Sequence, residues 1–404
     1  MAISCGIDWS ERHHDIALVA DDGRIVGRTR IDTGATGFTE LLELVAAQGQ
    51  QPSDVPVAIE TDKGLLVAAL VGAGFPVYAI NPRAVARYRE RFAQAGGKSD
   101  AADAAALANI VRTDRSVHRP LPRATERAAA IKVLARQHQE AIWARQQVVN
   151  RLRSLLIEFF PQALQAFPVL THKAARTVLA AAPTPAAAAE LTRQSTVELL
   201  RSCGRGNRPG VADRILAALQ AHALRQPRAV EEAFGASVTS LVAVIDAMEA
   251  GIAHLETTMS IEFNRHHHAD LLRPAPGLGP ILAARVLAEI GDDPTRFATA
   301  SALRAFAGTA PITRASGRSK AVSARRIRNK RLADACHWWA FASITKSPGA
   351  RAHYDRRRAA GDNHNAALRN LANKLLGRLW WCLQHNQPWE EHAAWPTHAT
   401  PAAA

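Results

Sequence analysis

The fold is most constrained at the start of the chain, where strand-like segments follow one another with short connections. The segments ISCGIDW (3–9), HDIALVA (14–20) and GRIVGRTRI (23–31) alternate as strands do, and Asp21-Asp22-Gly23 supplies turn chemistry between the last two. Helical stretches at 38–47 and 65–74 then alternate with two more strands, VPVAIE (55–60) and FPVYAI (75–80). Three antiparallel strands followed by alternating helix and strand predict an α/β layer fold.

This order of elements fits an RNase H-like (RuvC-like) domain and fits a dinucleotide-binding domain poorly. No G-x-G-x-x-G follows the first strand, and no P-loop sequence is present. The rest of the chain reads as mostly helical, so the predicted fold class is α/β plus all-α. With 404 residues, 48% of them hydrophobic, the chain can build several globular domains, which excludes disorder throughout.

Charge is distributed unevenly along the sequence. Residues 1–115 hold 15 acidic and 12 basic side chains, a net charge of −3, whereas the whole chain carries +14. The remainder therefore carries +17. We expect carboxylate chemistry in the first part and binding of a polyanion by the rest.

Two apolar stripes predict a helical stalk in the middle of the chain. The first lies on a helix expected from about Thr125 to Phe160 and ended by Pro161, and the second has the three-four spacing of a coiled coil. Short helices and loops are expected between them, with breaks at PTPAAAA (183–189) and GRGNRPG (204–210). The stalk is expected to pair internally, with a partner chain, or both, and an ordinary bundle core is the alternative. The stripes are Ile142, Val149, Leu152, Leu156 and Phe159, then Leu241, Ile245, Met248, Ile252, Leu255 and Met259.

Four carboxylates in the first part suit a two-metal site. Strand parity places Asp8 on the face opposite Ile7, and Glu60 on the face opposite Ile59. Asp100 and Asp103 lie three residues apart at the start of a predicted helix, on one face. Carboxylate oxygens are the ligands that Mg²⁺ prefers, and two ions about 4 Å apart can activate one phosphodiester oxygen and stabilise the other. The alternative is that Asp100 and Asp103 complement a helix dipole and Glu60 is an exposed strand end.

The second half contains a basic run and a serine in a small-residue loop. From residue 314 to 331 there are eight basic residues and no acid, a composition typical of phosphate contacts. Ser316 lies between Ala315 and Gly317, which leaves its hydroxyl accessible, although an isolated serine is a weak nucleophile. The segment PGLGP (276–280) indicates either a phosphate-binding turn or a glycine turn between packed helices. The basic residues are Arg314, Arg318, Lys320, Arg325, Arg326, Arg328, Lys330 and Arg331.

Several motifs together resemble the insertion sequence 110 family of transposases, the DEDD-type recombinases, several of which are guided by a structured bridge RNA. The early motifs are GIDWSERHHDIAL (6–18), VAIETDKGLL (57–66) and NPRAVARYRERFAQAGGKSDAADAAALA (81–108). The late motifs are PGLGPILAARVLAEIGD (276–292) and AGTAPITRASG (307–317). The resemblance covers roughly residues 3–160 and 270–385, and the order and spacing of the motifs make it specific.

The resemblance implies a RuvC-like DEDD nuclease domain (1–122), a helical coiled-coil assembly domain (123–268) and a transposase domain with a serine nucleophile (269–360). A C-terminal helix and flexible tail complete the chain (361–404). By motif position Asp8, Glu60, Asp100 and Asp103 are the implied metal ligands, with two Mg²⁺ ions expected and Mn²⁺ as a substitute. Asp62 competes with Glu60 but falls past the predicted strand end.

By the same resemblance, Ser316 is the implied nucleophile, and Ser319 and Ser323 are weaker candidates. The predicted function is Mg²⁺-dependent cleavage and exchange of DNA strands through a covalent phosphoserine intermediate. Expected partners are donor and target DNA, a structured guide RNA and further copies of the chain in a homodimer or homotetramer. The alternatives are a Holliday-junction-type or RNase H-like nuclease that uses water as nucleophile, and a non-catalytic nucleic-acid scaffold.

The remaining features predict ordinary structure. The four cysteines show no paired or zinc-type spacing, so free thiols are expected. Residues 64–82 are uncharged but carry glycines and Pro76, so we expect no membrane span and a cytoplasmic, nucleoid-associated protein. Consecutive His266, His267 and His268 are expected to form a polar helix end, because on a helix they cannot all face one ion. Trp338, Trp339, Trp380 and Trp381 are expected in a core or interface.

Overall fold

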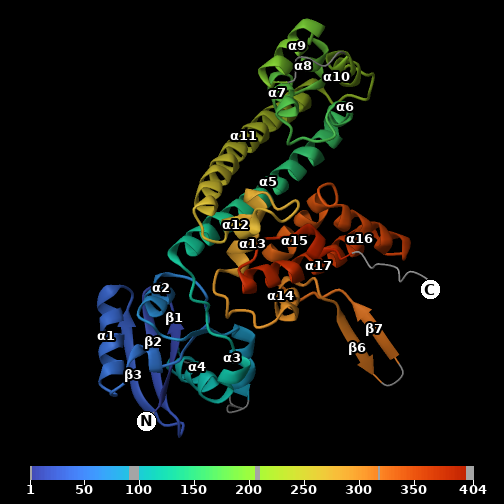
Figure 1. Ribbon diagram of the computed structural model, residues 1–404. Coiled ribbons are helices and arrows are strands. Elements are labelled where there is room, and N and C mark those ends of the chain that lie inside the picture. The colour runs from blue at the N-terminus through green and yellow to red at the C-terminus, as the bar shows by residue number, and fades with distance from the viewer. Residues whose placement is uncertain (1, 91–99, 205–209, 317–318, 397–404) are drawn as a thin grey trace, which may run out of the picture. The chain divides into compact units, whose positions relative to one another are not determined.

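The computed structural model describes residues 2–90, 100–204, 210–316 and 319–396, without the side chains of 314, 315 and 319–321 (Figure 1). The chain divides into two compact units, Met1–Arg123 and Ala124–Ala404. The first unit is α/β and the second is almost entirely helical. The predicted fold class, α/β plus all-α, is confirmed at this level.

The first unit is built on a five-stranded sheet of order β3-β2-β1-β4-β5. β1 (Ile3–Trp9), β2 (His13–Ala20) and β3 (Ile25–Asp32) are antiparallel, and β4 (Val57–Ile59) and β5 (Val77–Ala79) run parallel to β1. The prediction of three antiparallel strands followed by alternating helix and strand is therefore confirmed. The connecting elements are α1 (Ala35–Ala46), η1 (Pro52–Asp54), α2 (Leu65–Gly72), α3 (Pro82–Glu90), α4 (Asp100–Asp114) and η2 (Arg115–Val117).

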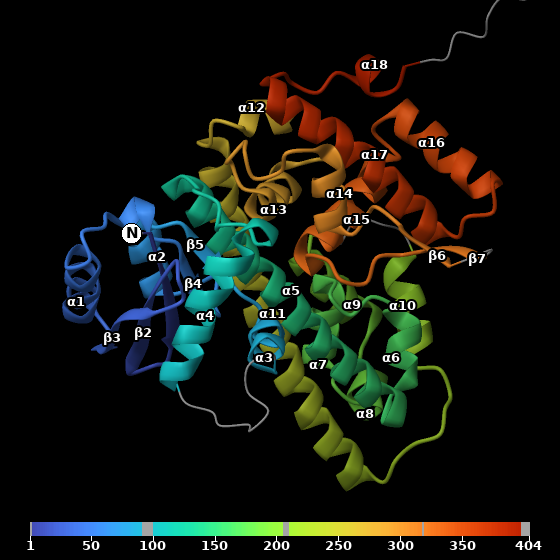
Figure 2. The same ribbon diagram turned by 90° about the horizontal axis from the view of Figure 1, so that it is seen from below.

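Different helices cover the two faces of this sheet: α1 and α2 pack on one face and α4 on the other. On one face, Ile7 and Ile59 belong to a core with Leu41 of α1 and Leu70 of α2. On the other face α4 lies against β1 and β2, and Figure 2 shows α1 and α4 on opposite sides of the sheet. Gly6 permits this close approach, since a Cβ at Gly6 would lie 1.9 Å from the carbonyl oxygen of Ala104. The N-terminal turn of α4 thereby lies close to the end of β1.

The second unit contains two long antiparallel helices, α5 (Glu126–Phe159) and α11 (Arg228–Asn264). At one end the rings of Phe159 and Phe234 stack with centroids 4.8 Å apart, and in the middle Arg145 donates a 3.0 Å hydrogen bond to Glu249. The expected helix from Thr125 to Phe160 is confirmed, with Thr125 as its N-cap and α6 beginning at Pro161. The two helices that carry the stripes pair within the chain, so the internal pairing expected for the stalk is present.

α11 is the one helix in the described part of the chain whose length and apolar composition would suit a membrane span. Two of its glutamates are nevertheless engaged by α5. Glu249 accepts a hydrogen bond from Arg145, and Glu256 lies 3.1 Å from Nε2 of His138. These contacts favour a helix packed in protein.

Short helices between α5 and α11 form a second core at the far end of the pair. This core joins Leu152 and Phe160 to Leu179, Leu200 and Ile215. The predicted break at 183–189 is present, but Thr184 caps a short helix within it, and most of the break at 204–210 lies outside the described residues. The helices are α6 (Pro161–Ala166), α7 (Lys173–Ala181), α8 (Pro185–Ala189), α9 (Arg193–Ser202) and α10 (Val211–Leu219).

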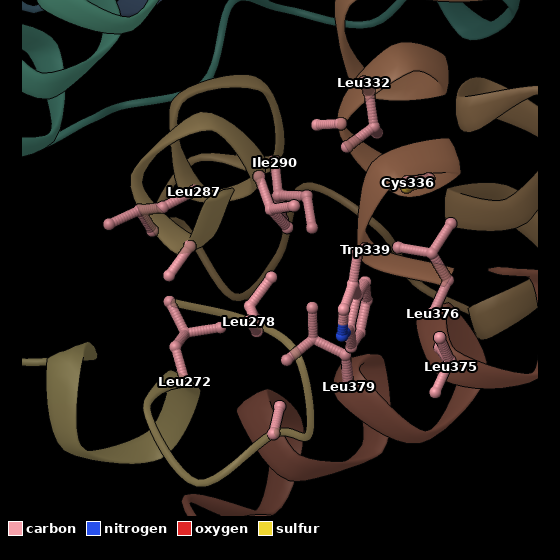
Figure 3. Close-up of a cluster of buried hydrophobic side chains, with 14 of the residues drawn as sticks. Leu272, Leu278, Leu287, Ile290, Leu332, Cys336, Trp339, Leu375, Leu376 and Leu379 are labelled. Carbon is pink, nitrogen blue, oxygen red and sulfur yellow. The ribbon is translucent and has the colours of Figure 1, made fainter. Parts of the chain in front are cut away.

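The C-terminal helices pack around Trp339, which is fully buried (Figure 3). Its indole Nε1 donates a 2.9 Å hydrogen bond to the carbonyl oxygen of Pro276. The same core includes Met259 and Phe263 of α11. It therefore joins residues on both sides of position 268, where the sequence predicted a domain boundary. The elements are α12 (Ala269–Leu272), α13 (Pro280–Ile290), α14 (Ala300–Ala307), β6 (Ile312–Ser316), β7 (Ser319–Ser323), α15 (Lys330–Ser343), α16 (Pro348–Ala359), α17 (His364–His385) and α18 (Glu391–Ala394).

Candidate active site: a carboxylate cluster and an exposed serine

Three carboxylates lie in a row across adjacent strands of the first unit. Asp8 of β1 is the direct register partner of Asp15 of β2. β1 and β4 pair in parallel up to Ile7 and Ile59, so Glu60 follows β4 at the position next to Asp8. Ile7 and Ile59 point into the core on the opposite face, which confirms the strand parity predicted for Asp8 and Glu60.

Helix α4 brings two further carboxylates to the same face of the sheet. Asp100 and Asp103 both lie in its first turn, Asp100 exposed and Asp103 buried. The contact between Gly6 and the backbone of α4 holds this turn close to the strand that carries Asp8. The predicted start of a helix at these aspartates is confirmed.

The electrostatics of Asp8 show how closely the acidic groups gather. The pKa of Asp8 is raised to about 6, first by burial and then by the charges of Asp103, Asp100, Glu60 and Asp15, in that order. All four predicted carboxylates thus contribute to one field, together with Asp15. A divalent cation would relieve this repulsion, and a set of carboxylate oxygens is the donor chemistry that Mg²⁺ or Mn²⁺ prefers. The residues present therefore fit such an ion.

Two arginines compensate part of this negative charge. Arg30 of β3 donates to both oxygens of Asp15, at 2.9 and 3.2 Å, and lies 3.6 Å from Asp100. Arg89 of α3 donates a 2.6 Å hydrogen bond to Asp103. Asp100 and Asp103 are therefore each contacted by an arginine of another element.

Sequence reasoning missed Asp15, Arg30 and His13 as neighbours of the cluster. The ligand atoms of His13, Asp15 and Asp100 all lie within 4.8 Å of one another, whereas within the described ranges Asp8, Glu60 and Asp103 do not form so tight a group. The sequence could have indicated Asp15, because its first two predicted strands form a hairpin. A register that pairs Asp8 with Asp15 places both side chains on one face of the sheet.

The structure favours Glu60 over Asp62 as a candidate metal ligand. Glu60 is half-buried and contributes to the field at Asp8, whereas Asp62 is exposed beyond the end of β4. Glu60 is the first residue after β4, which ends one residue earlier than the predicted strand.

Ser316 lies at the end of a two-stranded hairpin in the second unit. It is the last residue of β6 and the register partner of Ser319, the first residue of β7. Ser316 is exposed, as predicted; the sequence indicated a small-residue loop but not the strands on either side of it. Gly317 and Arg318 lie outside the described residues, as do the side chains of Arg314, Ser319 and Lys320; Ser323 is exposed at the end of β7.

The rest of the basic run continues from the hairpin into α15. Arg326, Arg328 and Lys330 are exposed, and Arg325 and Arg331 are partly buried. Arg331 is held by an ion pair with Glu140 and lies over the ring of Trp143, 5.9 Å from its centroid. Most of these side chains can therefore reach a polyanion.

The glycine segment PGLGP (276–280) is a packing turn. Gly277 has a φ of +76°, and a Cβ there would lie 2.6 Å from the backbone nitrogen of Ser343 on α15. Of the two interpretations offered by the sequence, the glycine turn between packed helices is confirmed.

The three consecutive histidines follow the end of α11 and do not lie on a helix. The prediction that helical geometry would keep them from facing one ion was therefore wrong. Their ring nitrogens lie within 4.8 Å of one another. His266 is nevertheless fully engaged, because its Nδ1 accepts from the backbone N–H of His268 and its Nε2 lies 3.2 Å from Asp292. The expectation of a polar helix end holds.

The four cysteines are free, as predicted. The tryptophans differ from one another: Trp339 is buried in the core, as expected, and Trp380 is partly buried against that core. Trp338 is 49% exposed and does not belong to a core.

Two family models match this chain, one near its start and one in its second half. A family model for the DEDD transposases of IS110, described as "Transposase", matches residues 5–161. A second, described as "Transposase IS116/IS110/IS902 family", matches residues 269–355. The two matches cover both regions that the sequence motifs had indicated.

Individual relatives match over nearly the whole chain. A Streptomyces coelicolor protein named "Mini-circle putative transposase for IS117" is 48% identical over 98% of this chain and 97% of its own length. The "Insertion element IS110 uncharacterized 43.6 kDa protein" of the same organism is 31% identical over 88% of this chain and 85% of its own length. The "Insertion element IS900 uncharacterized 42 kDa protein" of Mycobacterium paratuberculosis is 29% identical over 99% and 98%. The chain belongs to the IS110/IS116/IS902 family of transposases.

Proposed function

We propose that the chain cleaves and exchanges DNA strands, with the carboxylates around Asp8 and the hydroxyl of Ser316 acting in one composite site. The observation that carries the proposal is the field at Asp8, to which Glu60, Asp100 and Asp103 all contribute. The strand order β3-β2-β1-β4-β5 supports an RNase H-like (RuvC-like) first unit. Its antiparallel pairings are β1–β2 and β2–β3, and its parallel pairings are β1–β4 and β4–β5.

Asp8, Glu60, Asp100 and Asp103 are the residues proposed to hold Mg²⁺, with Mn²⁺ as a substitute. Bound divalent cations would neutralise the charge that develops on the scissile phosphate and its leaving oxygen. Asp8 lies on β1, Glu60 directly follows β4, and Asp100 and Asp103 lie in the first turn of α4, so the fold itself sets their spacing. Asp100 and Asp103 must exchange arginine contacts for a cation when the site is loaded.

The proposed chemistry at Ser316 is a transesterification. The hydroxyl oxygen attacks the phosphorus of a DNA phosphodiester, a phosphoserine bond forms, and the bond to the leaving DNA oxygen breaks. The hydroxyl proton passes to the acidic cluster, and the leaving oxygen is protonated from solvent. A second DNA hydroxyl then attacks the phosphoserine and regenerates Ser316, so the bond energy is conserved. The exposed end of the β6–β7 hairpin supports this role because a DNA strand can reach it.

The helical middle of the chain is proposed as an assembly segment. The α5–α11 pair presents a long antiparallel stalk that a second copy could extend, giving a homodimer or homotetramer in which the units of different copies complete a site. Donor and target DNA, and a structured guide RNA, are the proposed nucleic-acid partners, with the cytoplasmic nucleoid as the place of action. The basic residues from Arg325 to Arg331 support contacts with phosphates.

The test is strand exchange with the protein purified together with any RNA that copurifies, which is sequenced. Exchange should require Mg²⁺, Asp8 and Ser316, and RNase treatment should abolish it. Ser323→Ala is the matched control, since it removes an exposed hydroxyl from the same hairpin. Full exchange by both Asp8→Ala and Ser316→Ala would refute the proposal. Cleavage without exchange in Ser316→Ala would instead assign a nuclease that uses water.

A further inference from the structure

A cavity of about 510 Å³ opens in the second unit between the end of α14, the first turns of α15 and α17, and one side of α5. Its size falls within the range of about 300–1,000 Å³ that is usual for small-ligand sites. The residues that decide its chemistry are Trp143, Arg328, Lys330, Asp334, His337 and Arg369.

The cavity is positively charged. Arg328, Lys330 and Arg369 line it, and within the described residues no carboxylate forms an ion pair with any of the three. The one acidic lining residue, Asp334, is neutralised by a 2.6 Å ion pair with Arg285. Two helices, α15 and α17, also begin at this cavity, and helix N-termini favour anions. An anionic group is therefore the ligand that the lining favours.

Aromatic surface adjoins these cations. Trp143 is 38% exposed in the lining, with the guanidinium of Arg331 near its ring. Beyond the cavity, Trp338 and Phe341 of α15 are each about half exposed, with ring centroids 6.1 Å apart. His364, whose neighbour Asn365 lines the cavity, lies 6.4 Å from the ring of Phe341. We call Trp338, Phe341 and His364 the aromatic ledge.

The wall on the α14 side is preorganised by close packing. Gly308 ends α14 with a φ of +72°, and a Cβ there would lie 2.2 Å from Cδ of Arg328. The Arg328 stem therefore crosses the glycine directly. Thr309 beside it is buried and donates a 3.2 Å hydrogen bond to Asn373 of α17. Packing against the end of α14 therefore holds the Arg328 stem in place, and α17 in turn holds the end of α14.

We propose that this cavity binds one unpaired nucleotide of a nucleic-acid strand, with its phosphate at Arg328, Lys330 and Arg369 and its base against Trp143. The neighbouring bases then pass over the aromatic ledge. A cationic groove combined with exposed aromatic rings is the usual means of binding single strands, because the rings stack on bases that a duplex keeps inside. The proposal rests on the proposed function only in taking nucleic acid as the partner. The strand is an RNA loop or a displaced DNA strand, which share this chemistry.

The test measures fluorescence anisotropy of a labelled, unstructured 12-nucleotide DNA or RNA against the matched duplex. It uses the full chain in an Asp8→Asn background without Mg²⁺, so that no strand chemistry contributes. Single strands should bind at least fivefold more tightly than the duplex. Lys330→Gln combined with Arg369→Gln should weaken single-strand binding at least fivefold and reduce its salt dependence. A preference for RNA over DNA, or the reverse, identifies the source of the strand.

Base stacking is read separately with 2-aminopurine in the oligonucleotide, whose fluorescence is quenched on an aromatic ring. Trp143→Leu should remove the quenching and weaken binding at least fivefold, whereas Trp143→Phe should keep both. Arg369→Lys should likewise retain affinity, which guards against a folding effect. Arg193→Gln, which breaks an exposed ion pair with Asp213 far from the cavity, is the control and should change nothing.

Equal affinity for duplex and single strand, or unchanged binding in the Lys330/Arg369 and Trp143 variants, would overturn the proposal. Because the assay involves no cleavage, that result would leave the carboxylate–serine proposal untouched. Conversely, absence of strand exchange in an active-site assay would not affect the binding result.

Discussion

Asp8 and Asp15 face each other across the β1–β2 ladder, on the face that α4 covers. A like-charged pair at directly opposed positions destabilises a sheet unless something compensates for it. Here Arg30 holds Asp15, while the pKa of Asp8 is raised to about 6. The fold therefore carries a repulsion at this point that a bound cation would relieve.

The first prediction concerns the stability of the metal-free protein. Because the folded-state pKa of Asp8 lies above its unfolded value of 3.8, the native state binds more protons between those values, and Asp8 costs stability as pH rises from about 4 to about 6. Asp8→Asn should raise the melting temperature at pH 7.5, by about 2–4 °C for each kcal/mol of repulsion removed. The gain should vanish below pH 4.

The control for this experiment is Asp54→Asn, which removes one charge from an exposed residue of η1 in the same unit. It should leave the melting temperature nearly unchanged at both pH values. An Asp8→Asn protein that melts lower than the wild type at pH 7.5 without metal would contradict the inferred repulsion.

The second prediction concerns the competition between Arg89 and a cation for Asp103. Arg89 donates to Asp103 at 2.6 Å, so Arg89→Gln should free the carboxylate and strengthen Mn²⁺ binding by about tenfold for each 1.4 kcal/mol of competition removed. Titration calorimetry measures the affinity. Arg24→Gln breaks a comparable but exposed pair with Asp22 and should have no effect on Mn²⁺. Weaker Mn²⁺ binding in Arg89→Gln would show that the arginine supports the site.

The third prediction tests the packing that brings α4 to β1. Gly6→Ala places a Cβ against the Ala104 carbonyl and should destabilise the first unit by about 1–3 kcal/mol while weakening Mn²⁺ binding. Gly251→Ala is the matched substitution, because Gly251 lies exposed in α11 with no atom within 4 Å of its added Cβ. It should stabilise the protein by about 0.5–1 kcal/mol. Urea unfolding and calorimetry measure the two effects, and an unperturbed Gly6→Ala protein would refute the close approach.

The fourth prediction separates two adjacent tryptophans. Trp339→Ala should cost about 3–5 kcal/mol, because it empties the centre of the core drawn in Figure 3 and removes the hydrogen bond to Pro276. Trp338→Ala should cost less than about 0.5 kcal/mol, since the side chain is half exposed. Equal losses in the two variants would show that the α15 helix is rotated from its position here.

The alternation of residues along the first strands predicted much of the site. Ile7 and Ile59 fix the faces of their strands, and this alone placed Asp8 and Glu60 on the opposite face. Asp15 could not be added without the register of the hairpin, which depends on the turn as well as on the pattern. The arginines were unpredictable for a similar reason, since a long side chain reaches a partner that only tertiary structure brings near.

Other parts of the fold depend on information that a periodic pattern does not contain. The three-four spacing around Ile245 and Ile252 predicted a helix with an apolar seam, but it is compatible with a partner in the same chain or in another. Ser316 was predicted to be accessible, yet the β6–β7 hairpin beneath it was not, because the run from Arg314 to Lys320 carries few of the apolar residues that mark a strand. Trp338 and Trp339 are identical in sequence terms and differ only in which side of α15 they occupy.

The central claim, that Ser316 becomes bonded to DNA with the help of the carboxylates, is tested most directly by trapping the adduct. The protein, with its copurifying RNA, is incubated with Mg²⁺ and a nicked DNA substrate, denatured and digested, and the peptide containing Ser316 is analysed by mass spectrometry. The account predicts a nucleotide phosphate on Ser316 in the wild type and in Ser323→Ala, and none in Asp8→Asn. Cleaved DNA with free ends only, formed equally by Ser316→Ala, would contradict it.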